Sequence, residues 1–233
     1  MQYSLIDERM SHNCIHSLIA EEIMPIKLPP FSRLAPPVAS HPDMLLFIRK
    51  NTLFTSTQYY NEAKDVFNLI ERVSNVEIIT DDTDVCADYP MDISFNCFDC
   101  MGYLFGFKKH LSKNIIENSV NIANVKQGYS SCSTVCVDEN SIITADKSIA
   151  KKAQQLGADV CLISEGGVKL PPYEYGFIGG ACGVSGNSVY FTGNLDIHPC
   201  AKQIREFIDN RGKKVISLSD DILFDYGKIL FLP

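Results

Sequence analysis

The chain has 233 residues, of which 45% are hydrophobic and 21% are charged, and its formal net charge at pH 7 is −7. The acidic balance without a Lys/Arg cluster disfavours a nucleic-acid partner, and no apolar run is long enough for a membrane span. The first residues lack the layout of a signal peptide, and nine scattered cysteines are typical of free thiols, so we expect a cytoplasmic protein.

The first predicted elements are a helix and a strand. Residues 11–22 (SHNCIHSLIAEE) favour a short helix with Ser11 as its N-cap. Residues 23–30 favour a strand, although Pro25 weakens this prediction. The Pro-rich residues 28–37 are interpreted as a connector.

From residue 44 onward, the pattern strand–strand–helix–strand repeats. The spacing of apolar residues in 61–73 is helical, and the flanking segments alternate as strands do. Gly and Asn supply the backbone conformations that tight hairpin turns need. The predicted hairpins have their turns near Asn51, Gly102, Asn140 and Asn187, with the unit around Gly102 the weakest copy.

The last twelve residues, 222–233 (ILFDYGKILFLP), predict a further hairpin around Gly227 with no helix or strand after it. The N-terminal helix and strand would supply this missing half. We therefore predict an α/β fold, a five-bladed ββαβ propeller with pseudo-fivefold symmetry that is closed by the two chain ends. It would be one domain over residues 1–233, with blades at 40–90, 91–128, 129–170, 171–219, and 220–233 plus 1–30. The alternative is an ordinary doubly wound α/β domain with parallel strands.

This plan resembles the pentein superfamily, which contains guanidine-group-modifying enzymes and the ribosome anti-association initiation factor six. The resemblance is sharpest at residues 176–194, GFIGGACGVSGNSVYFTGN. This stretch looks like the Glu-Gly-Gly-Asp hairpin of arginine deiminases and dimethylarginine dimethylaminohydrolases, and Gly179 and Gly180 match its Gly pair. The resemblance implies a bacterial branch of that superfamily and a substrate with a guanidino group.

The chain departs from the catalytic pattern of those enzymes. Ile178 and Ala181 stand where they carry Glu and Asp, and the C-terminal hairpin that holds their nucleophilic Cys contains none here. Their catalytic His lies on a strand for which this chain offers residues 128–135 (GYSSCSTV). Only Gly179 and Gly180 therefore transfer, as structural residues.

Polar residues at the starts of the first strands are the best candidates for a site, because such strands would line the centre of the ring. We interpret Cys132 as a nucleophile and His41 as its base, with Asp43 as the third catalytic residue. Asp43 or Asp220 would bind a cationic substrate. Two alternatives stay open, in which Cys132 is a packed core thiol and Asp43 caps a turn. The substrate-binding candidates at equivalent positions are Asn96, Ser131, Gly180 and Asp220.

Other reactive side chains carry weaker signals. Cys97 and Cys100 have the spacing of a metal or redox pair, but side chains three apart on a strand point to opposite faces. We therefore predict no metal and no cofactor. His198 is interpreted as a cap or surface residue, and the long loop at residues 164–176 as a candidate lid over the site.

The sequence supports two functions. The first is a hydrolase- or amidinotransferase-like enzyme that acts on guanidino or amino-acid-like small molecules through Cys132. The second is a catalytically inactive binding or interaction protein, because the catalytic residues of the family are replaced. We expect a small-molecule ligand without nucleic-acid or membrane partners, and the sequence is compatible with a homo-oligomer. Fold alone does not decide between these functions.

Overall fold

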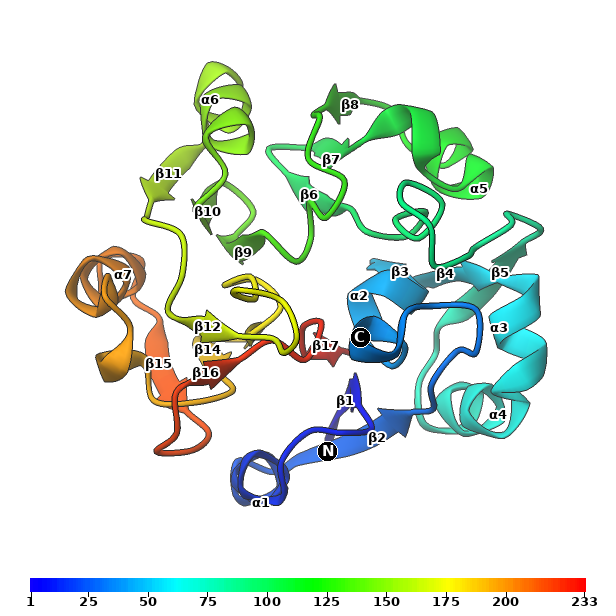
Figure 1. Ribbon diagram of the computed structural model, residues 1–233, viewed down its shortest axis with the longest axis horizontal. Helices are drawn as coiled ribbons and strands as arrows, with labels where there is room; N and C mark the ends of the chain where they lie inside the picture. The colour runs from blue at the N-terminus through cyan, green and yellow to red at the C-terminus, as the bar shows by residue number, and fades with distance from the viewer.

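The computed structural model describes residues 1–233, and its strands form small separate sheets (Figure 1). Five sheets have three strands each, and a sixth has two. The five larger sheets lie around a common centre in Figure 1. None of the helices combines the length and the apolar character needed to span a membrane.

Four of the three-stranded sheets follow one another along the chain and have the same plan. Two strands form an antiparallel hairpin, and a third strand joins the second in parallel after a helical crossover. The predicted strand–strand–helix–strand unit is thus confirmed. The strands are β3 (Leu46–Arg49), β4 (Thr52–Ser56), β5 (Glu77–Asp81); β6 (Phe98–Cys100), β7 (Tyr103–Gly106), β8 (Ile122–Asn124); β9 (Thr134–Asp138), β10 (Ser141–Thr144), β11 (Asp159–Leu162); and β13 (Cys182–Ser185), β14 (Ser188–Phe191), β15 (Lys214–Ser217).

Each crossover of these four sheets contains a helix. The outer helices in Figure 1 cover the sheets on the side away from the centre. In sheet order the crossover helices are α3 (Thr57–Glu62) with α4 (Lys64–Val73), α5 (Lys113–Glu117), α6 (Lys147–Gln155) and α7 (Ala201–Asp209). Short helical turns precede some elements: η1 (Pro36–Val38), α2 (Pro42–Leu45), η2 (Lys108–His110) and η3 (Leu195–Ile197).

The hairpin turns lie where the sequence predicts them. Lys50, Gly102 and Gly186 adopt positive φ angles of 51°, 72° and 52° in their turns. Glycine adopts such angles without a steric cost, which explains its place in two of the three turns.

The two ends of the chain share the fifth three-stranded sheet. Its central strand β1 (Gln2–Asp7) pairs in parallel with β2 (Ile23–Leu28) and antiparallel with β17 (Leu230–Phe231). Helix α1 (His12–Ala20) connects β1 to β2 and is capped by Ser11, as predicted. Because β2 is an edge strand, it tolerates Pro25, which has no N–H to donate. The expectation that the C-terminal strand joins the N-terminal elements is confirmed.

The predicted hairpin over residues 222–233 is wrong. Strand β16 (Leu223–Phe224) pairs with β12 (Val168–Lys169) in the two-stranded sheet, whereas β17 pairs with β1. The backbone N–H groups of Tyr226 and Lys228 instead donate to the Gly180 carbonyl, at 3.0 and 2.8 Å. Strand β1, which we did not predict, takes the place of the hairpin partner. The doubly wound alternative is also wrong, because the first two strands of each repeated unit are antiparallel.

The buried apolar residues form four clusters that connect neighbouring sheets. One joins Phe98 and Phe105 of the β6–β8 sheet to Ile142 and Ile149 of the next unit. The others continue the same arrangement, and one of them packs residues of α1 against residues of β14 and the C-terminal segment. Burial of apolar surface between units therefore holds the sheets together without strand pairing between them.

Candidate functional site

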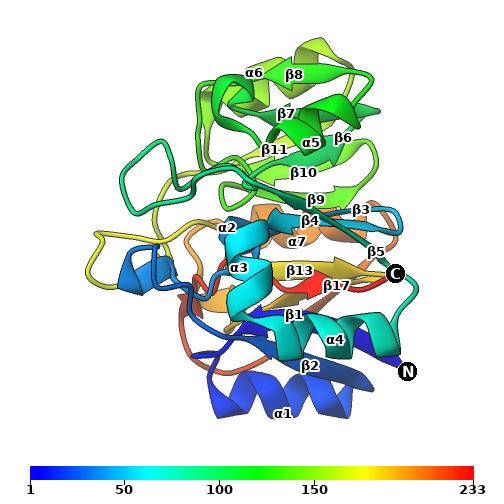
Figure 2. The same cartoon turned by 90° about the vertical axis from the view of Figure 1, so that its right-hand side faces the viewer.

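Three loops project from one side of the molecule (Figure 2). Residues of these loops line a cavity of about 380 Å³. The loops are residues 29–40, 82–92 and 170–177, and each contributes to the lining. The exposed part of the lining includes Tyr173, and the buried part includes Cys132. The third loop belongs to the predicted lid segment, and its residues form part of the cavity wall.

Asn96 joins three of the predicted site segments. Its side-chain Nδ2 donates to the Sγ of Cys132 at 3.0 Å and to the carbonyl of Asp43 at 3.1 Å. Its Oδ1 accepts from the backbone N–H groups of Ser131 at 2.7 Å and Cys132 at 3.3 Å. The carbonyl of Cys132 in turn accepts from the N–H of Gly180 at 2.9 Å. A buried amide that uses both of its ends fixes the position of the Cys132 thiol.

His41 lies in the cavity wall between two buried carboxylates. Its Nε2 is 3.7 Å from Oδ2 of Asp7, and its Nδ1 is 3.9 Å from Oδ1 of Asp225. Neither ring nitrogen has a hydrogen-bond partner, although the side chain is only 1% exposed. Asp7 is also held by Arg9, whose Nε donates to Oδ1 at 2.9 Å. The imidazole therefore lies close to two carboxylates but forms a hydrogen bond with neither.

Asp225 lies in the segment between β16 and β17, and backbone N–H groups hold its carboxylate. Its carboxylate accepts from the N–H groups of Phe177 at 2.8 Å and Gly227 at 2.9 Å. A Cβ added at Gly180 would overlap the Asp225 carboxylate, and a Cβ at Gly227 would overlap the side chain of His41. The glycines therefore make the space in which the carboxylate and the imidazole sit.

Gly179 allows a different close approach. A Cβ there would lie 2.5 Å from the Ser131 carbonyl and 2.6 Å from the Cys132 carbonyl. Only glycine lets the backbone of this unit pack so closely on the Ser131–Cys132 segment. The Gly179–Gly180 pair thus shapes the site through space, which agrees with its interpretation as structural.

Asp43 is a buried carboxylate with both oxygens unpartnered. Burial raises its pKa, and the positive charge of Lys228 opposes this effect. Lys228 itself donates from Nζ to the Thr134 carbonyl at 3.2 Å. A buried carboxylate without a partner is costly. Asp43 does not itself line the cavity, so a cation bound beside Cys132 would act on it through charge at close range.

The ionisation of the neighbouring groups follows from the same burial. Burial, followed by the charges of Asp43 and Asp225, raises the pKa of Cys132 well above that of an ordinary thiol. Burial lowers the pKa of His41, although Asp225 and Asp7 act in the opposite direction. In this structure the site is therefore a thiol and a neutral imidazole next to buried carboxyl groups.

The structure brings together most of the predicted site residues and separates one. Cys132 and His41 line the cavity, and Asn96 connects Cys132 to Asp43 behind it. Asp220 is exposed on a surface segment and does not line the cavity, so the structure does not place it with the other predicted site residues.

Asp43, Asn96, Ser131 and Gly180 do not line the cavity either. Ser131 and Gly180 support the site from behind. Ser131 donates its backbone N–H to Asn96, and Gly180 leaves room for Asp225.

Sequence reasoning missed four contributors to the site. Asp225 was interpreted only as part of a turn, although an Asp directly before Tyr226-Gly227 was a usable signal. Asp7 lies at the end of the strand that was not predicted. Asp92 and Tyr129 come from loops with no motif, and the Tyr129 hydroxyl donates to Asp92 at 2.7 Å.

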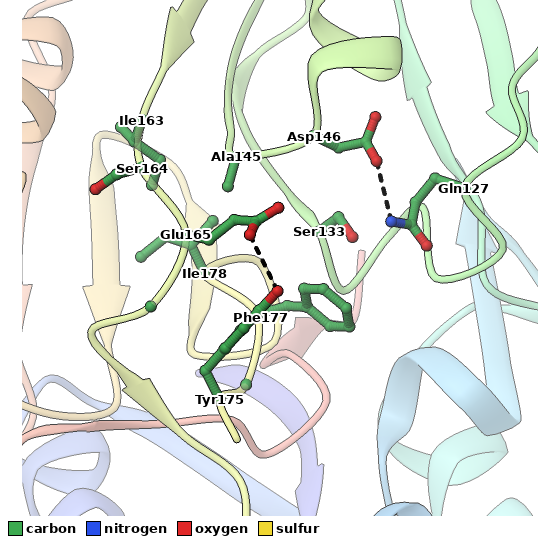
Figure 3. A pocket seen from close by; sticks show the side chains of 12 residues that line it. Gln127, Ser133, Ala145, Asp146, Ile163, Ser164, Glu165, Tyr175, Phe177 and Ile178 are labelled. Atoms are coloured by element: carbon green, nitrogen blue, oxygen red, sulfur yellow. Dashed lines mark hydrogen bonds between the residues drawn. The ribbon is translucent and has the colours of Figure 1, made fainter. Parts of the chain in front are cut away.

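A second, much smaller hollow of about 40 Å³ lies beside the cavity and shares Tyr175 and Phe177 with it (Figure 3). Its carboxylates are paired: Asp146 accepts from Gln127 at 3.0 Å, and Glu165 accepts from the hydroxyl of Tyr175 at 3.1 Å. This hollow offers no unpaired carboxylate to a ligand.

The remaining cysteines and His198 lie outside the cavity wall. All nine cysteines are free, and no group of three or more His, Cys, Asp or Glu side chains is arranged to hold a metal ion. His198 accepts from the N–H of Cys200 at 3.0 Å and lies 3.1 Å from the Gly166 carbonyl, which ties a loop to the start of α7.

Comparison with solved structures identifies similar folds at low sequence identity. A dimethylarginine dimethylaminohydrolase in adduct with 4-chloro-2-hydroxymethylpyridine has a TM-score of 0.55 and 13% identity, with 94% of this chain and 92% of that chain covered. A His-to-Gly variant of dimethylarginine dimethylaminohydrolase, in adduct with S-methyl-L-thiocitrulline, gives 0.56 and 14%, with 94% and 91% covered. SxtG, an amidinotransferase of the saxitoxin biosynthetic pathway from Microseira wollei, gives 0.52 and 12%, with 88% and 72% covered.

The sequence comparisons give a family but no annotated relative. No curated protein matches the sequence significantly. A family model described as "Family of unknown function (DUF6873)" matches residues 5–230. The chain therefore belongs to this family of unknown function (DUF6873), and its fold is that of the pentein superfamily.

Proposed function

We propose that the cavity binds a small molecule with a guanidino or similar cationic group and that Cys132 reacts with it. The observation that carries this proposal is the set of buried carboxylates at the cavity: Asp225 and Asp92 line it, and no Lys or Arg does. Asp43 adds a third buried carboxylate behind the wall, where Asn96 connects it to Cys132. A bound cation would satisfy these groups, and a guanidinium group has several N–H donors in one plane for them.

The aromatic part of the lining supports a cationic ligand as well. Tyr129 and Phe177 lie with ring centroids 6.1 Å apart, and the ring of Tyr129 also packs on that of Tyr89 at 5.7 Å. Aromatic faces attract cations, and they pack against the apolar chain that carries a guanidino group. The similar dimethylarginine and amidinotransferase structures agree with this substrate class as a proposal.

Cation binding would also activate the thiol. In the free protein, burial and the carboxylates keep Cys132 protonated, and a bound positive charge reverses part of this effect. The proton then passes from Sγ to the Asp43 carboxylate, whose own pKa is raised by burial. Sγ forms a bond to the guanidino carbon, and an amine leaves with a proton returned from Asp43.

The resulting thiouronium would be released by a second nucleophile. Water deprotonated by neutral His41 attacks the same carbon, and the C–S bond breaks to regenerate Cys132. An amine in the place of water would instead receive the amidino group. The atoms balance in both cases without an oxidant, a metal or another cofactor.

A second candidate is a binding protein that keeps the cation site but no longer performs chemistry. The raised pKa of Cys132 favours it, because a thiol that stays protonated at neutral pH is a poor nucleophile. Ile178 and Ala181 replace residues of the related enzymes and point in the same direction.

Labelling with 2-chloroacetamidine tests the thiol directly, since the probe carries the cationic group and loses chloride to an attacking thiolate. We expect fast labelling at Cys132 in the wild type and in a Cys200→Ser control, and loss of this label in Cys132→Ser. Equal labelling rates for wild type and Cys132→Ser would contradict a reactive site thiol. Guanidino compounds that protect Cys132 but release neither urea nor amine would favour the binding protein.

The arrangement of the sheets supports a proposal about the whole fold. We propose one domain over residues 1–233, in which five blades surround the site and the β1–β17 pairing joins the first and last parts of the chain. The interunit apolar clusters support this arrangement. We further propose a cytoplasmic protein with a small-molecule partner.

A further inference from the structure

The cavity wall contains acidic side chains but no Lys or Arg. Asp92, Glu174 and Asp225 are among its fourteen lining residues, and no Lys or Arg is. Asp225 lies close to His41 at the buried end, whereas Glu174 is exposed on the loop at the mouth. A ligand in this cavity therefore meets carboxylates at both ends.

Asp92 forms a second buried anionic point. Its side chain is 4% exposed, and its Oδ2 accepts from the Tyr129 hydroxyl at 2.7 Å. Its Oδ1 is buried and has no protein partner. Asp92 comes from the loop before β6, so it faces the cavity from a different segment than Asp225, which lies between β16 and β17.

The wall beside these carboxylates is suited to an uncharged chain. Met44, Leu170 and Phe177 line the cavity together with the ring of Tyr129. Methylene groups would lose contact with water against these side chains, which favours a ligand with an apolar connection between its polar ends.

The cationic side chains of the neighbouring segments do not line the cavity and have other partners. Arg9 binds Asp7 and donates to the Pro37 carbonyl at 2.8 Å. Arg33 donates to Gln58 at 2.9 Å and forms an ion pair with Asp84 at 2.6 Å, and the Lys228 ammonium donates to a carbonyl. A carboxylate on the ligand would find no cationic partner and would face like charge, which disfavours it.

We infer that the ligand carries two cationic groups joined by an apolar chain and has no carboxylate, with Asp92 as the residue that selects the second cationic group. This inference rests on the proposed function, in which the guanidino group lies near Cys132. It excludes an α-amino acid as the preferred substrate and favours a guanidinoalkylamine.

Three compounds that share one guanidinobutyl chain test the inference by calorimetry on the full chain. Butylguanidine has no second group, 4-guanidinobutylamine has an ammonium group, and 4-guanidinobutanoate has a carboxylate. We expect 4-guanidinobutylamine to bind roughly tenfold to a hundredfold more tightly than butylguanidine, the range for a hydrogen bond to a charged group. The carboxylate compound should bind most weakly.

Asp92→Asn locates the selectivity. In this variant the advantage of 4-guanidinobutylamine over butylguanidine should fall by about tenfold. Asn can still accept from Tyr129, so the fold is retained, and Asp88→Asn in the same exposed loop should leave the ratio unchanged.

The outcomes separate this inference from the proposed function. If butylguanidine binds as tightly as 4-guanidinobutylamine, or if the carboxylate compound binds best, the dication inference is overturned while the cation site remains. An unchanged ratio in Asp92→Asn overturns the role of Asp92. If none of the three compounds binds, the proposed function and the inference are both overturned.

Discussion

The cavity and the small hollow beside it contain similar side chains in opposite states of pairing. In the hollow, Asp146 caps α6 by accepting from Ser148 and Ile149 N–H groups at 2.8 Å, and it also accepts from Gln127. Burial raises the pKa of Asp146, but these hydrogen bonds together outweigh it and leave the pKa below its ordinary value. Behind the cavity wall, burial raises the pKa of Asp43, and the charge of Lys228 and the nearby Cys132 and Asn96 side chains only partly oppose it.

The difference separates polar groups that build the fold from those available to a ligand. A carboxylate with backbone donors stabilises the helix that it caps. A buried carboxylate without donors makes no such contribution and costs free energy until a partner arrives. Such a cost is typical of functional sites, where stability is given up for binding. The comparison predicts that equivalent substitutions in the two places have opposite effects.

The largest effect on the free energy of unfolding is expected from Gly180→Ala, because the added methyl group overlaps a side chain of the cavity wall. Because the added Cβ would occupy the position of the Asp225 carboxylate, we expect a loss of roughly 3 kcal/mol in unfolding free energy, the upper range for overpacking. Urea unfolding measures it.

Gly186→Ala is the matched control for this overlap. Gly186 has a positive φ of 52° but open space around its Cβ position, so only backbone strain of about 1–2 kcal/mol applies. Equal losses in the two variants would mean that Asp225 does not depend on the space at Gly180.

The second effect is that Asp43→Asn and Asp146→Asn should change the free energy of unfolding in opposite directions. Asp146 uses both carboxylate oxygens, and an amide offers only one, so Asp146→Asn should lower the unfolding free energy by about 1 kcal/mol. Asp43→Asn removes an unpartnered charge, so it should keep or raise stability by about 1 kcal/mol while butylguanidine binding falls. A comparable loss of stability in both variants would contradict the distinction between the two regions.

The third effect is the pH dependence of this stability difference. The folded-state pKa of Asp43 is raised by burial above the unfolded value of about 3.9, so the folded protein binds more protons than the unfolded chain between these values. The contribution of Asp43 is therefore fully present below about pH 4. It is lost as pH rises through the folded-state pKa.

Asp43→Asn removes this one titration, so the variant should gain stability relative to the wild type as pH rises above about 4. His41, whose pKa is lowered by burial, contributes with the opposite slope below about pH 6.5 in both proteins and cancels in the difference. A stability difference that is flat with pH would show that Asp43 does not titrate abnormally.

The repeated units could be predicted because their signals are local. Gly102 and Gly186 occupy turns that need positive φ, and Ser11 caps a helix through its own side chain. The pairing of the two chain ends could be predicted because four units were complete and the last lacked its helix and third strand. The approach of His41, Asp43, Asn96 and Cys132 then followed from placing equivalent strand starts at one centre.

The rest depends on contacts that no local pattern records. Strand β1 pairs with residues at the other end of the chain, so its neighbours in sequence do not reveal it. The final hairpin fails because β16 pairs with β12 and the following backbone binds Gly180 instead. Asp225, and not the predicted Asp220, lines the cavity next to this segment.

The smallest effect is expected at Asp220. Asp220 is exposed and outside the cavity, so Asp220→Asn should change the unfolding free energy by no more than about 0.5 kcal/mol, as is usual for surface positions. Butylguanidine affinity should also stay as in the wild type. Asp225→Asn tests the alternative carboxylate under the same conditions and should weaken that affinity, because Asp225 lines the cavity beside His41. If Asp220→Asn weakened binding as strongly as Asp225→Asn, the ligand would have to extend from the buried end to the exposed segment, and the cavity would not define the site.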